Sequence, residues 1–399
     1  MLPALCKKTL VDVDISGKRV LIRVDFNVPL NAEGGIVDDS RIIAHLQTIN
    51  YALQRNARVI LASHLGRPKG KVVPSMSLAP VAKRLKELFP GRVQVAGSCV
   101  GPEVEKAVAE LEGGEILLLE NTRFHPEEEK NDPDFARKLA FLCDVYVADA
   151  FSAAHRAHAT VAEIAKYVPA AVQGFLMEKE VFHLGRLLDS PQRPFQVVLG
   201  GAKVKEKIEL IQSLLGKADN IAVGGGMCYT FLKVEGKSIG KSILDEEHLE
   251  SVTSVLEDAE SAGTTLLLPV DVVVATEIKD DAKTSTVSVD SIPDDQKGLD
   301  IGPETVKLFR SAIESAATVF WNGPMGVFEN PLFAKGTIAI AKALAASKGT
   351  TVIGGGETVS AATMAGVVDA MTHVSTGGGA SLEFLAGRTL PGIAALDDK

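Results

Sequence analysis

The 399-residue chain has only four cysteines, which are widely spaced and form no C-x-x-C pair or zinc-finger pattern. This scarcity argues against a disulfide-stabilised fold and indicates reduced, mostly buried thiols in a cytosol-like compartment. No uncharged apolar run reaches the roughly 18 residues that a membrane-spanning helix needs. Residues 1–6 lack the basic and apolar segments of a signal peptide, so we expect a cytoplasmic protein that contacts no membrane.

Two phosphate-binding fingerprints are also missing. No G-x-x-x-x-G-K-[ST] occurs, which excludes a P-loop, and no G-x-G-x-x-G occurs, so the dinucleotide fingerprint is absent. The formal net charge of −9 does not suggest a nucleic-acid surface. His155 and His158 are spaced like a metal pair, but no third ligand recurs at a suitable spacing, so we reject a zinc site.

Arginine is nearly absent from the second half of the chain. Of fifteen arginines, thirteen lie at or before Arg193, and only Arg310 and Arg388 follow. A solvated helix face would not sort arginine in this way. Because guanidinium groups bind carboxylates and phosphates through paired hydrogen bonds, the first half is predicted to hold an anion site.

Short apolar runs alternate with helical patterns of ten or more residues throughout the chain. This alternation is typical of βαβ units and predicts an α/β fold with largely parallel sheets, and the length suggests two or three domains. The stretch 173–190, helical and then turn-like, is the natural boundary between two halves. Helices are predicted over residues 40–56, 78–89, 102–111, 134–142, 203–215, 246–262, 304–316, 331–346 and 358–365.

In the first half, four strand-like runs end in polar residues. The endings are Asp25-Phe26-Asn27, Ser63-His64-Leu65-Gly66-Arg67, Glu120-Asn121-Thr122-Arg123 and Asp149-Ala150-Phe151, the last followed by His155-Arg156. Any one of them could be an ordinary polar loop, and Asp25 and Asn27 could simply cap the turn before Pro29. Since ligands of open α/β sheets bind beyond the carboxyl ends of strands, the four endings together favour a ligand site.

In the second half, four comparable runs end in glycines that open helices. The endings are Gly200-Gly201-Ala202-Lys203, Gly224-Gly225-Gly226, Gly354-Gly355-Gly356-Glu357 and Gly377-Gly378-Gly379. A single such turn is weak evidence, because glycine also permits close helix–strand packing. Four of them favour bare backbone N–H groups that bind phosphates. Two anions held by two halves suggest group transfer, and phosphoryl transfer requires mainly positioning and charge neutralisation.

Three charged residues stand near predicted helix starts. Arg41 follows an N-cap run, Asp38-Asp39-Ser40, and so falls in the first turn of a helix, where a cation opposes the helix dipole. It could be a surface arginine paired with one of these aspartates, but the other strand-end arginines favour a functional role. Lys203 and Lys207 are predicted to share one helix face at i, i+4, just past the first glycine turn.

Taken together, these motifs closely resemble the phosphoglycerate kinase family, in the family's order and over essentially the entire chain. The matching segments are Arg23-Val24-Asp25-Phe26-Asn27-Val28-Pro29, Ser63-His64-Leu65-Gly66-Arg67-Pro68, Leu119-Glu120-Asn121 with Arg123-Phe124, Asp149-Ala150-Phe151 with Ala154-His155-Arg156-Ala157-His158, Leu199-Gly200-Gly201-Ala202-Lys203-Val204, Gly224-Gly225-Gly226-Met227, Trp321-Asn322-Gly323-Pro324 with Gly326-Val327-Phe328-Glu329, and Ser375-Thr376-Gly377-Gly378-Gly379-Ala380-Ser381.

The resemblance implies two doubly wound, Rossmann-like parallel-sheet domains joined by a helix, with a cleft between them. It implies a triose-phosphate domain over 1–172, an interdomain helix over 173–190, a nucleotide domain over 191–387 and a tail, 388–399, packed back on the first domain. The implied reaction is reversible phosphoryl transfer from 1,3-bisphosphoglycerate to Mg-ADP, giving 3-phosphoglycerate and Mg-ATP, in glycolysis, gluconeogenesis or carbon fixation. It also implies a hinge-bending cytoplasmic monomer with Mg²⁺ as the cofactor of ATP and ADP and no nucleic-acid partner.

The resemblance further assigns residues to three roles. Those implied to bind the triose are Asp25, Phe26, Asn27, Arg41, His64, Leu65, Gly66, Arg67, Arg123 and Arg156. Those implied to bind the nucleotide are Gly201, Ala202, Lys203, Lys207, Gly225, Gly226, Gly298, Leu299, Asn322, Glu329, Gly354, Gly355, Gly356, Glu357 and Thr358. Those implied to act on the transferring phosphoryl group are Arg41, Lys203, Lys207, Gly356 and Gly379.

Two positions depart from the family's pattern. Glu357 stands where the family usually has an aspartate that binds the nucleotide's magnesium, so the metal geometry is in doubt, although Glu357 is still the expected metal ligand. Ser152-Ala153 replaces the usual Gly-Thr, a loop change that we expect the fold to tolerate.

Two other functions remain alternatives from the sequence. A nicotinamide-dependent dehydrogenase would explain the glycines but not the arginine-rich first half, and a saturable fluorescence change with NAD(H) would reveal it. A catalytically silent sugar-phosphate-binding protein is the second alternative. ATP-dependent turnover of 3-phosphoglycerate would eliminate it.

Overall fold

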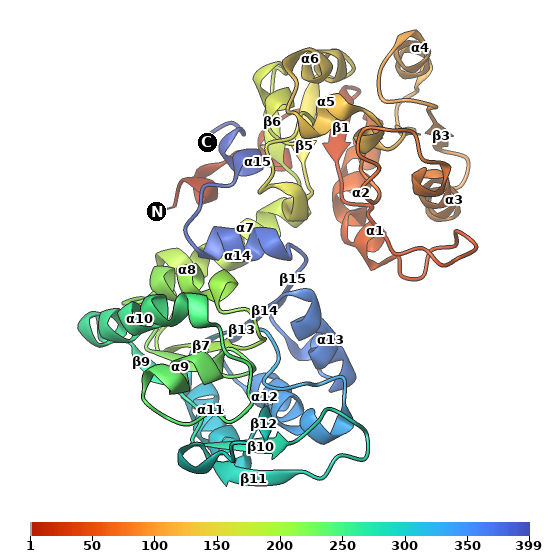
Figure 1. Ribbon diagram of the computed structural model, residues 1–399. Coiled ribbons are helices and arrows are strands. Elements are labelled where there is room, and N and C mark those ends of the chain that lie inside the picture. Colours follow the sequence, from red (N-terminus) through yellow and green to blue (C-terminus); the bar gives the residue numbers. More distant parts are fainter. Residues whose placement is uncertain (1) are drawn as a thin grey trace. The chain divides into compact units, whose positions relative to one another are not determined.

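The computed structural model describes residues 2–399, which divide into two compact units. The first unit comprises the chain up to Gly185 together with Thr389–Lys399, and the second comprises Arg186–Arg388. The helix α7 (Phe175–Asp189) contains the point at which the chain passes from the first unit to the second (Figure 1).

The first unit is built on a parallel sheet of six strands in the order β3-β4-β2-β1-β5-β6. Its central strands are almost wholly buried, as expected for a parallel sheet covered on both faces. The strands are β1 (Arg19–Arg23), β2 (Arg58–Ala62), β3 (Val93–Val95), β4 (Ile116–Leu118), β5 (Val145–Ala148) and β6 (Ala171–Gln173).

Helices cover this sheet because alternate strand residues point to opposite faces. On one face, Val20 and Ile22 of β1 join a buried cluster with Ile49 of α2 and Leu85 of α3. The helices of this unit are α1 (Ser40–Ala44), α2 (Leu46–Gln54), α3 (Ala79–Leu88), α4 (Pro102–Glu110), α5 (Pro126–Glu129), α6 (Pro133–Phe141) and α15 (Pro391–Ala394).

The second unit contains a six-stranded parallel sheet in the order β15-β14-β13-β7-β8-β9 and a small antiparallel sheet in the order β11-β10-β12. The larger sheet consists of β7 (Phe195–Leu199), β8 (Asn220–Val223), β9 (Thr265–Leu267), β13 (Thr318–Asn322), β14 (Thr350–Gly354) and β15 (His373–Ser375). The smaller sheet consists of β10 (Asp271–Ala275), β11 (Ser285–Ser288) and β12 (Lys297–Ile301).

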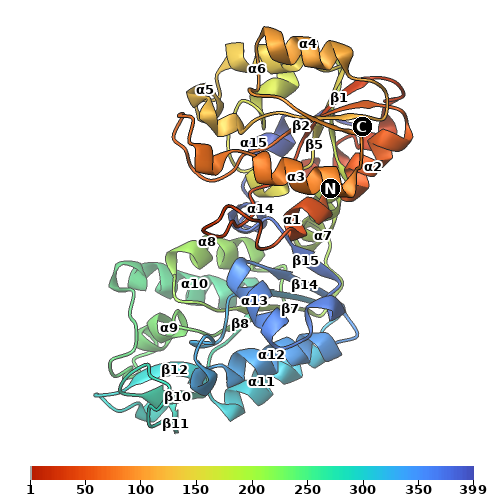
Figure 2. The same cartoon turned by 90° about the vertical axis from the view of Figure 1, so that its right-hand side faces the viewer.

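Helices lie on both faces of the larger sheet, three of them on the side of α12 and four on the side of α8 (Figure 2). The first group is α11 (Pro303–Ser315), α12 (Lys335–Ala346) and α13 (Gly356–Met364). The second group is α8 (Lys205–Leu214), α9 (Cys228–Val234), α10 (Leu249–Ala262) and α14 (Gly379–Leu385). Two doubly wound parallel sheets are therefore present, and the predicted fold class is confirmed.

Four predicted helices differ from the structure. Those predicted from residues 246 and 331 begin only at Leu249 and Lys335. The helix over 40–56 is broken into α1 and α2 at His45, whose Nε2 accepts a hydrogen bond from the Asp25 N–H at 2.9 Å and whose Nδ1 lies 2.7 Å from Asp149 Oδ2. The helix predicted from residue 203 begins only at Lys205, because the chain must first leave the turn at Gly200 and Gly201. Lys203 and Lys207 therefore do not share a helix face.

The two parallel sheets have the same kind of reversal point. In the first, β1 lies between β2 and β5, and in the second, β7 lies between β8 and β13. In each sheet, the first strand has one neighbour on either side, and the connections to these two neighbours run in opposite directions. This arrangement opens a crevice at the carboxyl ends of the strands. Both sets of strand-end motifs lie beside these reversal points.

The last residues of the chain pack within the first unit. Leu390, Ile393 and Leu396 are each at most 3 % exposed. Lys7 Nζ donates to the Leu396 carbonyl at 2.7 Å, and the Gly392 N–H donates to the Ala154 carbonyl at 2.9 Å. The apolar tail is thus held by both buried side chains and backbone hydrogen bonds. Over residues 2–399, no helix has the length and apolar character needed to cross a bilayer.

Candidate functional site

At the carboxyl end of β1, Asp25 is the centre of a hydrogen-bonded group. Its carboxylate forms an ion pair with Arg41, accepts a hydrogen bond from Ser152 Oγ, and accepts the Asn27 N–H at 3.1 Å. Burial disfavours ionisation of Asp25, but its positive neighbours and these donors outweigh burial, so the pKa of the carboxyl lies below its usual range. Because His64 is itself neutral, we attribute the electrostatic lowering of the Asp25 pKa to the charge of Arg41.

Arg41 is therefore not a surface arginine paired with its neighbours in sequence. It lies in the first turn of α1, as predicted, but its partner is Asp25 rather than Asp38 or Asp39. Asp39 makes no side-chain cap and instead accepts a hydrogen bond from Arg84 Nε at 2.8 Å. With 41 % of its side chain exposed, Arg41 remains accessible to a ligand.

His64, at the carboxyl end of β2, is 5 % exposed and lies against the buried Arg23. Its Nδ1 is 3.1 Å from Arg23 Nη2. Burial and the nearby guanidinium of Arg23 lower the pKa of His64 well below its usual value, so the ring is neutral at neutral pH.

Arg123 joins two strand-end segments. Its Nη1 donates to the Gly66 carbonyl at 2.8 Å, while the Gly66 N–H donates to Asn27 Oδ1 at 2.9 Å. Burial, followed by the charges of Arg156 and Arg23, lowers the pKa of Arg123 to about 10. These cations repel one another, so an anion placed among them would lower the electrostatic energy.

The remaining predicted triose residues differ in accessibility. Phe26 and Leu65 are buried, so only their backbone could face a ligand. Arg156 is partly exposed and donates from Nε to His155 Nε2 at 3.2 Å, and Arg67 is exposed. The structure thus joins Asp25, Asn27, Arg41, Gly66 and Arg123 through direct contacts, with His64 within electrostatic reach of Asp25, Arg123 and Arg156.

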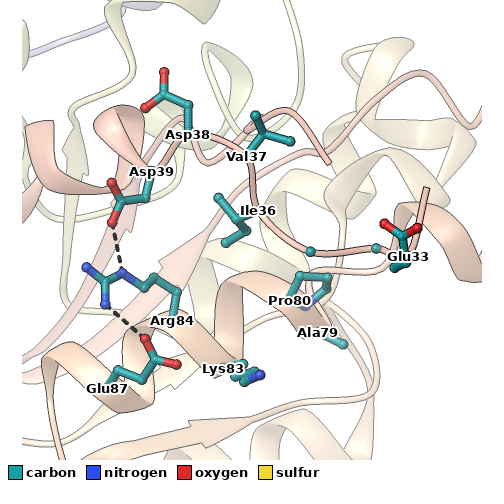
Figure 3. Close-up of a pocket in the computed structure, with 12 residues that line it drawn as sticks. Glu33, Ile36, Val37, Asp38, Asp39, Ala79, Pro80, Lys83, Arg84 and Glu87 are labelled. Carbon is teal, nitrogen blue, oxygen red and sulfur yellow. Dashed lines mark hydrogen bonds and ion pairs between the residues drawn. The ribbon is translucent and has the colours of Figure 1, made fainter. Parts of the chain in front are cut away.

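A cavity of about 710 Å³ in the first unit lies away from this cluster, between the loop 33–39 and the start of α3 (Figure 3). Arg84 spans it by bonding Asp39 at 2.8 Å and Glu87 at 2.9 Å. None of the predicted site residues lines this cavity, and two of its four carboxylates, Asp39 and Glu87, already have a partner in Arg84.

In the second unit, a cavity of about 410 Å³ lies beside the reversal point of the larger sheet. It is lined by many of the predicted nucleotide residues, namely Gly201, Ala202, Gly225, Gly226, Gly298, Leu299, Glu329 and Glu357. Sequence reasoning missed other lining residues, including Tyr229, Lys241, Ile243, Lys297 and Pro324. Pro324, Gly326 and Val327 stood in a recognised motif, whereas Tyr229, Lys241, Ile243 and Lys297 carry no local signal.

The glycines of the first two turns serve close packing. A Cβ on Gly200 would lie 2.1 Å from the Pro324 carbonyl, and one on Gly225, which has φ +63°, would lie 2.5 Å from the Gly201 nitrogen. The Gly201 N–H donates to the Pro324 carbonyl at 2.8 Å, and the Gly225 N–H to the Met325 carbonyl at 3.1 Å. The prediction of bare N–H groups is therefore wrong for Gly201 and Gly225, because both donors are used by backbone carbonyls of the segment that follows β13.

The last two glycine turns are different. A Cβ on Gly356 or Gly379 would meet no atom within 4 Å, and neither residue needs a left-handed backbone. They are the first residues of α13 and α14, so their N–H groups have no acceptor inside the helix. Bare donors and free space thus coincide at these two turns.

The turn before α13 is fixed by two polar side chains. Asn322 Nδ2 donates to the Gly354 carbonyl at 2.5 Å, and Thr358 Oγ1 accepts the Gly323 N–H at 2.7 Å. Both side chains are at most 3 % exposed, so they join the end of β13 to the turn after β14 rather than offer an open contact. Gly355 in this turn has φ +94°, which only glycine adopts readily.

Lys203 and Lys207 have opposite surroundings. Lys203 is 75 % exposed and pairs with Glu206 at 3.0 Å, whereas Lys207 is 7 % exposed. Burial lowers the pKa of Lys207 to about 8.

Glu357 is the one predicted metal ligand, and its exposed side chain lines the cavity. No cluster of three or more potential ligands occurs within residues 2–399. An accessible carboxylate such as Glu357 suits Mg²⁺, which usually takes one or two carboxylates and completes its coordination with phosphate oxygens and water. The residues present therefore fit a magnesium ion that arrives with a nucleotide.

Each unit is thus a doubly wound α/β sheet whose predicted ligand residues lie at the carboxyl ends of its strands, where sheets of this class bind their ligands. The sequence profile of the family described as phosphoglycerate kinase matches residues 10–388. The chain belongs to the phosphoglycerate kinase family.

Individual relatives cover almost the whole chain. It is 54% identical to a phosphoglycerate kinase of Moorella thermoacetica over 99% of this chain and 100% of the relative, and 53% identical to that of Chlorobium limicola over 98% and 100%. The phosphoglycerate kinase structure from Coxiella burnetii matches with TM-score 0.91 and 40% identity, and that from Pyrococcus horikoshii with 0.83 and 32%, each covering 98% of both chains.

Proposed function

We propose that this protein is a phosphoglycerate kinase, which transfers a phosphoryl group reversibly between 1,3-bisphosphoglycerate and Mg-ADP to give 3-phosphoglycerate and Mg-ATP. The observation that carries the proposal is the group of cations at the carboxyl edge of the first sheet, each held by its neighbours, in a chain whose relatives are phosphoglycerate kinases. The acceptor carboxylate needs no general base because it is already ionised at neutral pH.

In the first unit, the triose is bound by charge and by oriented donors. Arg123, Arg156 and Arg67 supply guanidinium groups for phosphate and carboxylate oxygens. Asp25 and Asn27 bind the polar groups of the triose that lie between its phosphate and its carboxylate. Arg41 has the role of stabilising the transferring phosphoryl group, because its partner Asp25 fixes it while its side chain stays accessible.

In the second unit, the cavity accommodates the base and ribose of the nucleotide, with Leu299 as an apolar wall and Glu329 as a ribose partner. Lys203 and Lys207 are the cations for its phosphates. The N–H groups of Gly356 and Gly379 stabilise charge on the phosphoryl group, in the manner of an oxyanion hole.

Glu357 would hold the nucleotide's Mg²⁺, directly or through a water molecule. When bound, this ion neutralises phosphate charge. A carboxylate in the first turn of α13 is also favourable near the positive end of the helix dipole.

We further propose that the functional domains are residues 1–172 and 191–387, linked by the helix 173–190 and completed by the tail 388–399. The protein is proposed to act as a cytoplasmic monomer in glycolysis or carbon fixation. Direct transfer requires the two bound substrates to meet, so the proposal includes a hinge-bending movement.

A coupled assay with 3-phosphoglycerate and Mg-ATP tests the function directly. We expect ATP-dependent turnover that disappears without either substrate and falls strongly in Arg123→Ala. Absence of turnover, in a preparation whose circular dichroism shows a folded protein, would refute the proposal. Titration with NAD(H) serves as the control for dehydrogenase activity and should give no saturable fluorescence change.

A further inference from the structure

Arg23 is a buried arginine for which the proposed function has assigned no role. It ends the central strand β1, where it pairs in register with Ala62 of β2 and Ala148 of β5, and only 2 % of it is exposed. Its guanidinium makes three directed contacts: Nε donates to Thr160 Oγ1 at 2.8 Å, Nη1 donates to the Val24 carbonyl, and Nη2 lies 3.1 Å from His64 Nδ1.

The contacts behind Arg23 fix its orientation. Thr160 Oγ1 accepts from Arg23 and donates its own proton to Glu128 Oε1, while the Thr160 N–H donates to Glu128 Oε2 at 2.9 Å. Glu128 and Thr160 are both fully buried. The guanidinium therefore cannot turn away from His64 without leaving buried polar groups unsatisfied, which is unfavourable.

The chemistry of the pair determines where the imidazole proton lies. A guanidinium has five donors and no acceptor, so a hydrogen bond between Arg23 Nη2 and His64 Nδ1 requires Nδ1 to accept. A neutral imidazole that accepts at Nδ1 carries its proton on Nε2. Within residues 2–399, Nε2 of His64 has no hydrogen-bond partner, and it is not sealed from solvent.

We propose that Arg23 is a positioning residue that holds His64 as the neutral, Nε2-protonated tautomer, so that Nε2–H donates a hydrogen bond to an oxygen of the triose ligand. Burial and the guanidinium of Arg23 lower the pKa of His64, which supports the neutral ring. The tautomer follows from the geometry alone, whereas the identity of the ligand rests on the proposed function.

The wild-type protein provides the first test. Long-range ¹H–¹⁵N correlation spectra of protein labelled with ¹⁵N-histidine, without substrate at neutral pH, distinguish a protonated from an accepting ring nitrogen. We expect His64, assigned by its loss in His64→Gln, to show an accepting Nδ1 and a protonated Nε2. A proton on Nδ1, or on both nitrogens, would overturn the proposal.

The second test removes the donor while keeping much of the side chain's length. In Arg23→Met we expect His64 to lose its single tautomer and the KM for 3-phosphoglycerate to rise about 3- to 10-fold, the effect of one weakened hydrogen bond, with a smaller change in kcat. The KM for Mg-ATP should not change. Retention of the same single tautomer in a folded Arg23→Met would refute the role of Arg23.

Arg19→Met is the matched control. Arg19 lies on the same strand, and its Nη2 is 2.6 Å from Asp144 Oδ1, so its replacement also removes a carboxylate contact. Arg19 makes no contact with His64. It should leave the His64 spectrum and both KM values unchanged. If Arg23→Met does not fold, the wild-type spectrum still decides the tautomer. Failure of the coupled assay alone would refute the kinase proposal and leave the tautomer result standing.

Discussion

The first unit builds its site from side chains that hold one another, whereas the second builds its site from backbone and empty space. Arg41 is anchored by Asp25, and Arg123 by the Gly66 carbonyl. In the second unit, Lys203 is mostly exposed, and a Cβ added to Gly356 or Gly379 would meet only open space. The comparison teaches that a small, highly charged ligand can be met by a preformed set of cations. A nucleotide needs room and supplies much of its own charge compensation through its metal ion.

Replacing the cations that we propose to face the transferring group should lower catalytic activity most severely. We expect Arg41→Ala and Lys203→Ala each to lower kcat by roughly 10²–10³-fold with a much smaller change in KM, because each loses a contact made mainly in the transition state. Steady-state kinetics with both substrates measures the split. Arg84→Ala and Lys205→Ala are matched controls outside the site and should retain normal kcat. A raised KM with near-normal kcat would show that the residue contributes only to substrate binding.

Glu357 tests whether the second site depends on a metal-binding carboxylate. Glu357→Gln should lower activity by more than about tenfold and weaken its dependence on magnesium, because the amide is a poorer ligand. Glu357→Asp should stay within about tenfold of the wild type, a barrier change of about 1.4 kcal/mol or less. An unchanged magnesium titration curve for Glu357→Gln would contradict the metal-ligand role.

The glycines sharpen the comparison because some are needed for close packing, whereas others border space that a ligand could occupy. Gly200→Ala places a Cβ against the Pro324 carbonyl and should destabilise the protein by about 1–3 kcal/mol in urea unfolding. Gly379→Ala meets no neighbour, so its stability should not fall, yet its activity should fall because the methyl group occupies ligand space. Equal activity of Gly379→Ala and the wild type would show that this space is not used.

The smallest effect concerns the buried cation of the second unit. Burial lowers the pKa of Lys207 to about 8, so the lysine loses its charge as the pH rises through that value. We expect kcat/KM for Mg-ADP to be about tenfold lower at pH 9 than at pH 7, since this parameter reports ionisation in the free enzyme. Lys207→Arg, which stays charged, should remove the decline. A wild-type profile that is flat to pH 9 would contradict the assignment.

Lys207 also affects stability with a definite sign. Its folded pKa lies below the usual value of 10.5, so folding releases a proton between these two values. The unfolded chain binds more protons there, and stability should therefore rise as the pH increases from about 8 towards 10. Unfolding free energies of the wild type and Lys207→Arg across this range would show the contribution.

The sequence by itself determined the α/β class and the strands that end in the recognised motifs. Apolar runs such as Val59–Ala62, alternating with helical patterns, indicate a covered parallel sheet, and a polar ending then lies at its carboxyl edge. The joint occurrence of these motifs also identified the family, because each is long and their order is fixed.

Only the tertiary structure decided how each residue is used, because the partners are distant in sequence. His45 breaks a continuous helical pattern because it bonds Asp25 and Asp149, which neither its neighbours nor its periodicity reveals. Gly201 resembles Gly356 in sequence, yet it packs backbone on backbone, while Gly356 opens onto free space. A local pattern records conformational preference, whereas hydrogen-bond partners, burial and pKa depend on groups that folding brings from elsewhere in the chain.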